Sequence, residues 1–169
     1  MFNVEKSNNI GMLICSAYAF GCEELLVVGR PKIVVTGAQG TQAFMKRRIF
    51  PTLRAAVEDC HANGFAVCGL EVGGTRLDQA PFEQDTAFLL GNEGRGMGNT
   101  AELCDRLLCI PQWGGVPSLN VAVAGSIAMY EFQRRQDVAP ARVEGDRYVD
   151  DVFVPNVKAA GWDMHRDPE

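Results

Sequence analysis

Short apolar runs alternate along the chain with segments whose apolar residues recur at helical spacing. Five runs have the length and composition of buried strands, at residues 2–4, 23–29, 65–71, 86–91 and 106–110. Helical spacing predicts helices over residues 11–21, 52–64, 100–105 and 118–136. Strands that alternate with helices predict an α/β fold, with a mainly parallel sheet and helices on both faces.

The last part of the chain has a different character. Residues 1–135 carry 12 Lys and Arg against 13 Asp and Glu, whereas residues 136–169 carry 4 basic and 8 acidic residues. Scattered prolines and the lack of a steady apolar period also distinguish residues 136–169. We therefore expect one folded domain over residues 1–135 and an acidic C-terminal tail over 136–169, partly ordered or disordered.

Composition excludes several classes of protein. No apolar run approaches the roughly 20 residues that a membrane span needs, and the start, MFNVEKSNN, has no signal-peptide pattern. We expect a cytoplasmic protein, with nuclear or organellar residence left open. The six cysteines form no C-x-x-C pair and there are only two histidines, so we expect buried or half-buried free thiols and no metal site.

Glycine-rich loops follow two of the predicted strands. Residues 89–99, LLGNEGRGMGN, lack the lysine of a phosphate-binding P-loop and the context of a dinucleotide fingerprint. Taken alone, this loop is a tight turn in which Glu93 caps a following helix. Residues 109–120, CIPQWGGVPSLN, lead into the longest helix, where Ser118 is the expected N-cap, as Asn8 or Asn9 is for the first helix.

Together and in this order, three motifs resemble those of the SpoU (TrmH-like) class of SPOUT RNA methyltransferases. The first motif, N-x-G-x-x-x-R in that class, is here Asn9, Gly11 and Cys15. The second, G-x-E-x-x-G, matches Gly91, Glu93 and Gly96. The third is the most specific and matches Ile110, Pro111, Gly114, Ser118, Leu119, Asn120, Ala122 and Ala124. The resemblance covers about residues 1–135.

The resemblance implies a fold, a cofactor and an assembly. In that class two loops pass through one another as a deep C-terminal trefoil knot and hold S-adenosyl-L-methionine in a bent form. By resemblance, the cofactor pocket would be lined by Leu70, Gly91, Ile110, Ser118 and Leu119. The glycines would let the cofactor approach bare backbone, where a Cβ would collide. Members are homodimers, with the first and last helices at the interface.

The implied activity is transfer of a methyl group to a ribose 2′-hydroxyl of transfer RNA or ribosomal RNA. By resemblance Glu93 orients the loops, Asn9 and Asn120 position the reacting groups, and Ser118 fixes its loop. The sequence departs from the class at Cys15, which stands where the class has a catalytic arginine. Arg95 is the nearest arginine that could take that role, with Arg54 and Arg76 as more remote candidates.

Four alternatives therefore stay open. The chain is an active RNA 2′-O-methyltransferase that uses another arginine, or a catalytically inactive relative that binds cofactor or RNA, or an enzyme that methylates a different nucleophile. A cofactor-free scaffold in a larger complex is the fourth. For the RNA partner, the basic cluster Lys46, Arg47 and Arg48 is the candidate contact.

Overall fold

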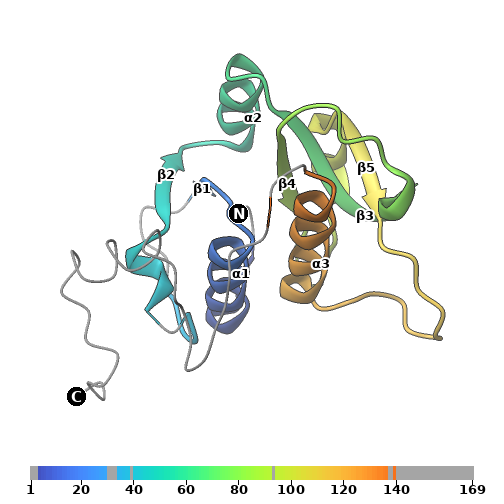
Figure 1. The fold of residues 1–169 in the computed structure, drawn as a ribbon, viewed down its shortest axis with the longest axis horizontal. Helices are drawn as coiled ribbons and strands as arrows, with labels where there is room; N and C mark the ends of the chain where they lie inside the picture. Colours follow the sequence, from blue (N-terminus) through green and yellow to red (C-terminus); the bar gives the residue numbers. More distant parts are fainter. Residues whose placement is uncertain (1–3, 30–33, 39, 93, 137–138, 140–169) are drawn as a thin grey trace. The chain divides into compact units, whose positions relative to one another are not determined.

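The computed structural model describes residues 4–29, 34–38, 40–92, 94–136 and 139, which belong almost entirely to one compact unit, Met1–Gln136. The predicted α/β fold is confirmed (Figure 1). Its helices and strands follow in the order α1 (Ser7–Ala19), β1 (Glu24–Val28), β2 (Lys46–Phe50), α2 (Leu53–Ala62), β3 (Ala66–Arg76), β4 (Thr86–Leu90), β5 (Arg106–Cys109) and α3 (Val121–Arg134), with short 3-10 helices η1 (Thr41–Ala43), η2 (Leu77–Gln79) and η3 (Gly98–Leu103) between them.

All strand pairs that the structure describes between named strands are parallel. β1 pairs with β2, and β3 lies between β4 and β5 in a second, three-stranded sheet. In this second sheet Leu70 of β3 lies level with Leu90 of β4 and Leu108 of β5. The pairing of β3 with β5 is interrupted after Leu70 and resumes at Thr75, so residues 71–74 bulge out of the ladder.

Alternation along the strands places helices on both faces, as the sequence predicts. In β1, Leu25 and Val27 pack with α1 and α3, whereas Val28 packs with α2. β4 repeats this division, because Leu90 lies in the first of these clusters and Leu89 in the second. Successive side chains of a strand point to opposite faces, so one run of apolar residues supplies both layers of the core.

α1 and α3 lie side by side (Figure 1) and approach closely at small residues. A Cβ on Gly125 of α3 would stand 2.6 Å from Cδ2 of Leu13 and 2.9 Å from Cδ1 of Leu90. At the next residue of α3, the Ser126 hydroxyl donates to the Ser16 hydroxyl of α1 at 2.7 Å. The small residues of α3 therefore allow this helix to pack closely against α1.

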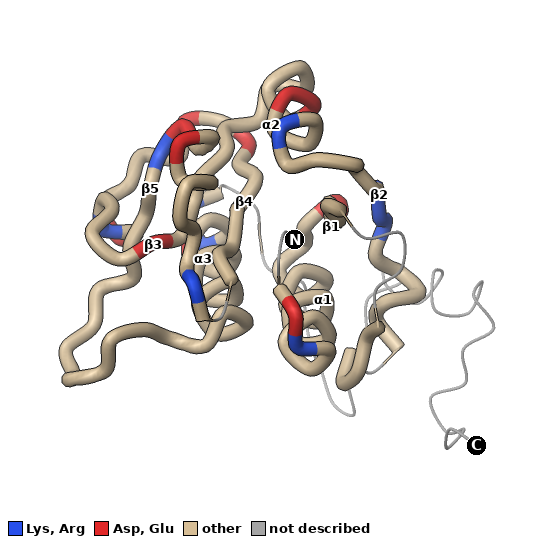
Figure 2. The backbone as a smooth tube through the Cα atoms, turned by 180° about the vertical axis from the view of Figure 1, so that it is seen from behind, with Lys and Arg blue, Asp and Glu red and all other residues tan. Residues whose placement is uncertain are grey.

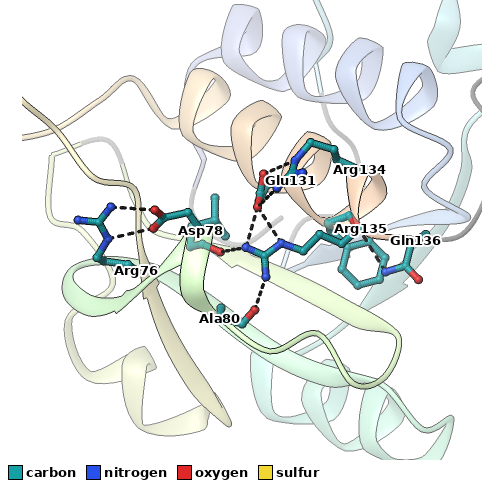
Figure 3. A network of polar contacts seen from close by, with 9 residues as sticks. Arg76, Asp78, Ala80, Glu131, Arg134, Arg135 and Gln136 are labelled. Atoms are coloured by element: carbon teal, nitrogen blue, oxygen red, sulfur yellow. Dashed lines mark hydrogen bonds and ion pairs between the residues drawn. The ribbon is translucent and has the colours of Figure 1, made fainter.

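The C-terminal end of α3 is tied to the segment after β3 by one arginine (Figure 3). The Arg135 guanidinium donates to the carbonyl oxygens of Ala80 at 2.6 Å and Leu77 at 3.1 Å, and to Glu131 at 2.7 Å. It also lies over the ring of Phe82, 5.3 Å from the centroid. These contacts fix the connection between β3 and β4 against the helix.

Several predicted elements differ from the structure. The strand predicted over residues 2–4 falls mostly outside the described residues, and Val4 is buried but in no strand. β2 was not predicted, because KRRIF lacks apolar alternation and only pairing with β1 makes it a strand. The helix expected over 100–105 is the 3-10 helix η3. β3 is longer than expected because it continues beyond its bulge.

Both cap predictions were wrong. α1 begins at Ser7 after an extended Lys6, so Asn9 lies inside the first turn. α3 begins at Val121, and its N-cap is Asn120, not Ser118, since Asn120 Oδ1 accepts from the N–H groups of Ala122 and Val123. Asn120 caps α3 through Oδ1, and its amide nitrogen makes a second contact with Asn9 that is described below.

The remaining sequence predictions concern the tail, the thiols and membranes. The tail of residues 136–169 lies outside the described residues except for Gln136 and Ala139. The predicted burial of the cysteines is confirmed, since Cys60 and Cys68 are buried and the other four, all free, are half-buried. In the described part of the chain, no helix has the length and apolar character to cross a membrane.

Candidate functional site

Three of the predicted cofactor residues follow neighbouring strands of the second sheet. Leu70 ends the regular part of β3, Gly91 follows β4, and Ile110 follows β5. The register sets them at one edge, because Leu70 is level with Leu90 and Leu108. All three are half-buried. Carboxyl ends of adjacent parallel strands are the usual ligand-binding edge of an open α/β sheet.

A hydrogen bond between two asparagines joins the first motif to the third. Asn120 Nδ2 donates to Asn9 Oδ1 at 3.1 Å, across 111 residues of sequence. Asn9 is only 3% exposed and is the one buried polar residue in the described part of the chain. The same Asn120 side chain caps α3, so one residue fixes both the helix end and the first motif. Nearby, Gly11 is required by a close approach, because its Cβ would lie 1.9 Å from the Thr36 carbonyl oxygen.

The loop of the second motif is closed on itself. Asn92 and Gly96 exchange backbone hydrogen bonds of 2.9 and 3.0 Å, and Gly96 has a positive φ of 62°. A Cβ on Gly91 would lie 2.8 Å from the Gly96 carbonyl oxygen. The chain itself therefore occupies the space beside Gly91, and a side chain there would collide with the backbone of the same loop.

Glu71 also holds this loop, and the sequence reasoning missed it. Its carboxylate accepts from the backbone N–H of Met97 at 2.9 Å and from that of Val72 at 2.9 Å. Glu71 stands directly after Leu70, in the bulge of β3. The bulge is fixed on its other side too, where the Cys109 thiol donates to the Gly74 carbonyl oxygen at 3.0 Å. An acid at the end of a predicted strand was the only signal in the sequence.

The loop of the third motif, residues 111–119, is open. Among the described residues, the structure gives no hydrogen bond to the backbone groups of this loop. Of the two predicted cofactor residues in this loop, Ser118 is exposed and Leu119 half-buried, and both lie directly before the N-cap of α3. Exposed N–H and C=O groups next to half-buried apolar side chains suit a ligand with a planar ring and a polar edge.

The candidate catalytic residues separate into distinct environments. Arg95 lies exposed in the second-motif loop, and its guanidinium has no partner among the described residues. Arg76 is committed to Asp78 by two hydrogen bonds of 2.7 and 3.0 Å, and Arg54 lies on the first turn of α2. Cys15 is half-buried within α1. Glu93 lies outside the described residues.

The basic cluster lies on β2 (Figure 2). Arg48 forms ion pairs with Glu24 and Asp59, and the hydrogen bonds that its guanidinium donates to Glu24, and then to Asp59, raise its pKa above the ordinary value. Lys46 is exposed and 3.7 Å from Glu24, whereas Arg47 is exposed without a partner among the described residues. Two of the three cations are therefore accessible.

A cavity of about 300 Å³ lies at the opposite end of the second sheet. Ala66, Thr86 and Arg106, the first residues of three strands, line it together with a hydrogen-bonded pair, His61 and Asp105. Burial acts to raise the pKa of Asp105, but hydrogen bonds from Val67 N–H and His61 outweigh it and leave the pKa below the ordinary value. None of the predicted site residues lines this cavity, and the motif residues gather at the other ends of the strands.

Residues 1–130 match the model of the SpoU rRNA Methylase family. This chain belongs to that family. The matched span of residues 1–130 contains the segments of all three motifs. The α/β fold with parallel strands agrees with solved structures of the family.

Three proteins illustrate the relationship. Over 141 residues the chain is 31% identical to an uncharacterized tRNA/rRNA methyltransferase of Synechocystis sp., covering 79% of this chain and 37% of that one. The SpoU methyltransferase AviRb of Streptomyces viridochromogenes, solved in complex with AdoMet, is 27% identical with a TM-score of 0.72, over 79% of this chain and 58% of that one. A structure described as giving insights into the 2-OH methylation of C/U34 on tRNA is 27% identical with a TM-score of 0.70, over 79% and 91%. The chain thus spans well under two thirds of the first two proteins.

Proposed function

We propose that this chain is an S-adenosyl-L-methionine-dependent RNA methyltransferase that acts on ribose 2′-hydroxyls of transfer RNA or ribosomal RNA. The observation that carries the proposal is the joining of the three family motifs at one edge of the sheet. Leu70 lies in β3, level with the ends of β4 and β5 that Gly91 and Ile110 follow, and the bond between Asn9 and Asn120 brings the first motif to the third. Family membership, the AdoMet complex of AviRb and the tRNA 2-OH methylation described for one neighbour support the same activity.

The residues present fit the proposed cofactor. Leu70, Ile110 and Leu119 supply half-buried apolar contacts at the strand ends, which suit an adenine ring. The loop of residues 111–119 leaves its backbone groups free to bind the polar edge of that ring. No Asp, Glu, Lys or Arg occurs between Leu107 and Tyr130, so this side of the site recognises by shape and hydrogen bonds and not by charge.

When bound, S-adenosyl-L-methionine would supply the methyl group on a sulfonium that an oxygen nucleophile displaces in line. The work left to the protein is orientation of the ribose hydroxyl and acceptance of its proton. Asn9 and Asn120 hold the two motifs in a fixed geometry, and Glu71 holds the loop that carries Arg95. We assign to Arg95 the role of the family arginine that Cys15 replaces, because its guanidinium is unpaired among the described residues and lies on the second-motif loop.

The first test is calorimetric titration with S-adenosyl-L-methionine and S-adenosylhomocysteine, followed by methyl transfer to unfractionated transfer RNA and ribosomal RNA. We expect micromolar binding and product RNA that resists alkaline cleavage at the methylated ribose. Arg95→Ala is expected to lower the transfer rate at least about 100-fold, the scale of a lost charge-stabilising donor, with little change in cofactor binding. Arg54→Ala, which removes an exposed arginine on α2, is the matched control, and Cys15→Arg tests whether the family residue raises activity. If the folded protein gives no heat of binding with either compound, even in the presence of RNA, the proposed enzyme is refuted and a non-enzymatic relative is favoured.

We propose that the RNA contacts the exposed cations of β2. Lys46 and Arg47 are accessible, whereas Arg48 holds β1 and α2 together through Glu24 and Asp59. Replacing Lys46 and Arg47 with Gln is expected to weaken RNA binding and lower the slope of log affinity against log salt by about 1.4 for single-stranded RNA. Arg48→Gln should reduce stability in addition. Unchanged affinity and slope in the double variant would remove this surface from the proposal.

We further infer a homodimer formed through α1 and α3, and a trefoil knot made by residues 91–97 and 110–120. Large apolar side chains that are exposed on these helices support the dimer, namely Met12, Val123 and Tyr130 at 42%, 45% and 53%. Light scattering should give twice the monomer mass, and Tyr130→Glu should shift it toward the monomer. A monomeric wild-type chain at micromolar concentration, or a crystallographic trace in which the loops do not thread, would contradict these two inferences.

A further inference from the structure

We infer that Trp113 is a stacking platform for an unpaired base of the RNA substrate, an inference that rests on the proposed function. The indole of Trp113 is 90% exposed, more than any other large hydrophobic side chain in the described residues. An exposed tryptophan gives up the large apolar contact that burial would provide, so its presence on an open loop points to a partner.

The position of Trp113 connects it to the site. It lies three residues after Ile110, and the loop that carries it ends at Ser118 and Leu119, which are predicted cofactor residues. In Figure 1 this loop runs out from the end of β5 and returns to the start of α3. A base that stacks on Trp113 would therefore belong to a nucleotide close to the methylated ribose.

The surroundings of the indole leave room for a flat ligand. A Cβ added to Gly114 or Gly115 would meet no atom within 4 Å, and neither glycine has a positive φ. The two glycines are thus required neither by turn geometry nor by internal packing. Val116, 59% exposed, adds a second apolar side chain to the same loop. Because the neighbouring residues are small, they leave the face of the indole ring accessible to a flat ligand.

The charge pattern favours an RNA base over other partners. The loop and the start of α3 carry no charged residue (Figure 2), so the loop cannot hold phosphate by charge and does not repel it either. Stacking on an aromatic face is the sequence-tolerant way to hold a base without charge. The exposed cations that could hold the backbone lie elsewhere, at Arg95 and on β2.

A stacking contact and a phosphate contact differ in how RNA affinity depends on salt, so binding experiments can tell them apart. Stacking contributes about 1–3 kcal/mol per base, so Trp113→Ala is expected to weaken binding of unfractionated transfer RNA by about 5- to 160-fold. Because no phosphate contact is lost, the slope of log affinity against log salt should stay unchanged. The Lys46 and Arg47 double variant is the matched contrast, since it should lower the slope. Trp113→Phe should retain most of the affinity, and Trp113→Leu, which keeps apolar area without a π face, should not.

Fluorescence tests the contact directly in the full chain. The sequence has only one other tryptophan, Trp162, so Trp162→Phe leaves Trp113 as the sole reporter. We expect saturable quenching of its emission by unfractionated transfer RNA, with no change on dilution of the protein alone. Equal RNA affinity for wild type and Trp113→Ala would overturn the inference. An emission change that follows protein concentration and not RNA would overturn it too, and would assign the indole to a second copy of the chain. Wild-type protein that binds cofactor but no RNA would refute the proposed RNA substrate, and this inference with it.

Discussion

The hydrogen bond between Asn9 and Asn120 offers the sharpest test of how the site is assembled. Asn120→Ala removes two functions at once, the cap of α3 and the donor to Asn9. Asn120→Asp separates them, because a carboxylate still accepts from the Ala122 N–H but has no N–H to donate to Asn9 Oδ1.

The magnitudes follow from the two contacts. Loss of an asparagine cap costs about 1 kcal/mol, and loss of one neutral hydrogen bond to a buried group costs about 1 kcal/mol more. We expect Asn120→Ala to lower the free energy of unfolding by about 2 kcal/mol and Asn120→Asp by about 1 kcal/mol. The double variant Asn9→Ala with Asn120→Ala should show a coupling energy of about 1 kcal/mol, above the ~0.3–0.5 kcal/mol within which independent sites add.

Urea unfolding of wild type, the single variants Asn9→Ala, Asn120→Ala and Asn120→Asp, and the double variant measures these differences. Titration with S-adenosyl-L-methionine measures their effect on the site. Cofactor affinity should fall in Asn120→Asp even though the helix remains capped, because the first and third motifs are no longer tied together. A coupling energy below ~0.3 kcal/mol would show that the two asparagines act independently. Cofactor affinity equal to wild type in Asn120→Asp would refute the link between this bond and the site.

Three further predictions follow from the packing. Arg135→Met should lower the free energy of unfolding in urea by about 2 kcal/mol, because two carbonyl oxygens and Glu131 lose their shared donor. The control Arg134→Met removes a side chain that is 54% exposed and should lower it by less than about 1 kcal/mol. Equal losses in the two variants would refute the network assigned to Arg135. Gly125→Ala should destabilise the protein by about 1–3 kcal/mol through overpacking, despite the gain of ~1 kcal/mol in helix propensity. Gly114→Ala, where an added Cβ meets no atom within 4 Å, should leave the stability close to that of wild type. A Gly125→Ala variant more stable than wild type would contradict the close packing of α1 and α3. Burial raises the pKa of the Cys22 thiol to about 11, so alkylation at pH 8 should be about 100-fold slower than in the urea-unfolded chain, and equal rates by mass spectrometry would contradict this burial.

The pattern of apolar residues alone predicted the elements whose identity depends on local sequence. The four apolar strands β1, β3, β4 and β5 and the helix α2, with its buried face of Leu53, Ala56, Val57 and Cys60, are where the sequence predicts them. Strands buried on both faces need unbroken apolar runs, and a helix that covers a sheet needs one apolar stripe, so both leave a legible pattern. The motifs, likewise, were sufficient to indicate the family that residues 1–130 match.

Contacts between distant segments were decided only by the tertiary structure. β2 is a strand because its backbone pairs with β1, and its charged residues give no sequence pattern that predicts this pairing. In the sequence Asn9 looks like a local cap, and only the packing of α1 against α3 brings it to Asn120. Glu71 is an ordinary acid after a strand until the bulge of β3 turns its carboxylate toward the second-motif loop. The propensity of a segment for helix or strand depends on its own residues and their near neighbours. The partner of a polar side chain depends on which strands and helices the core brings next to each other.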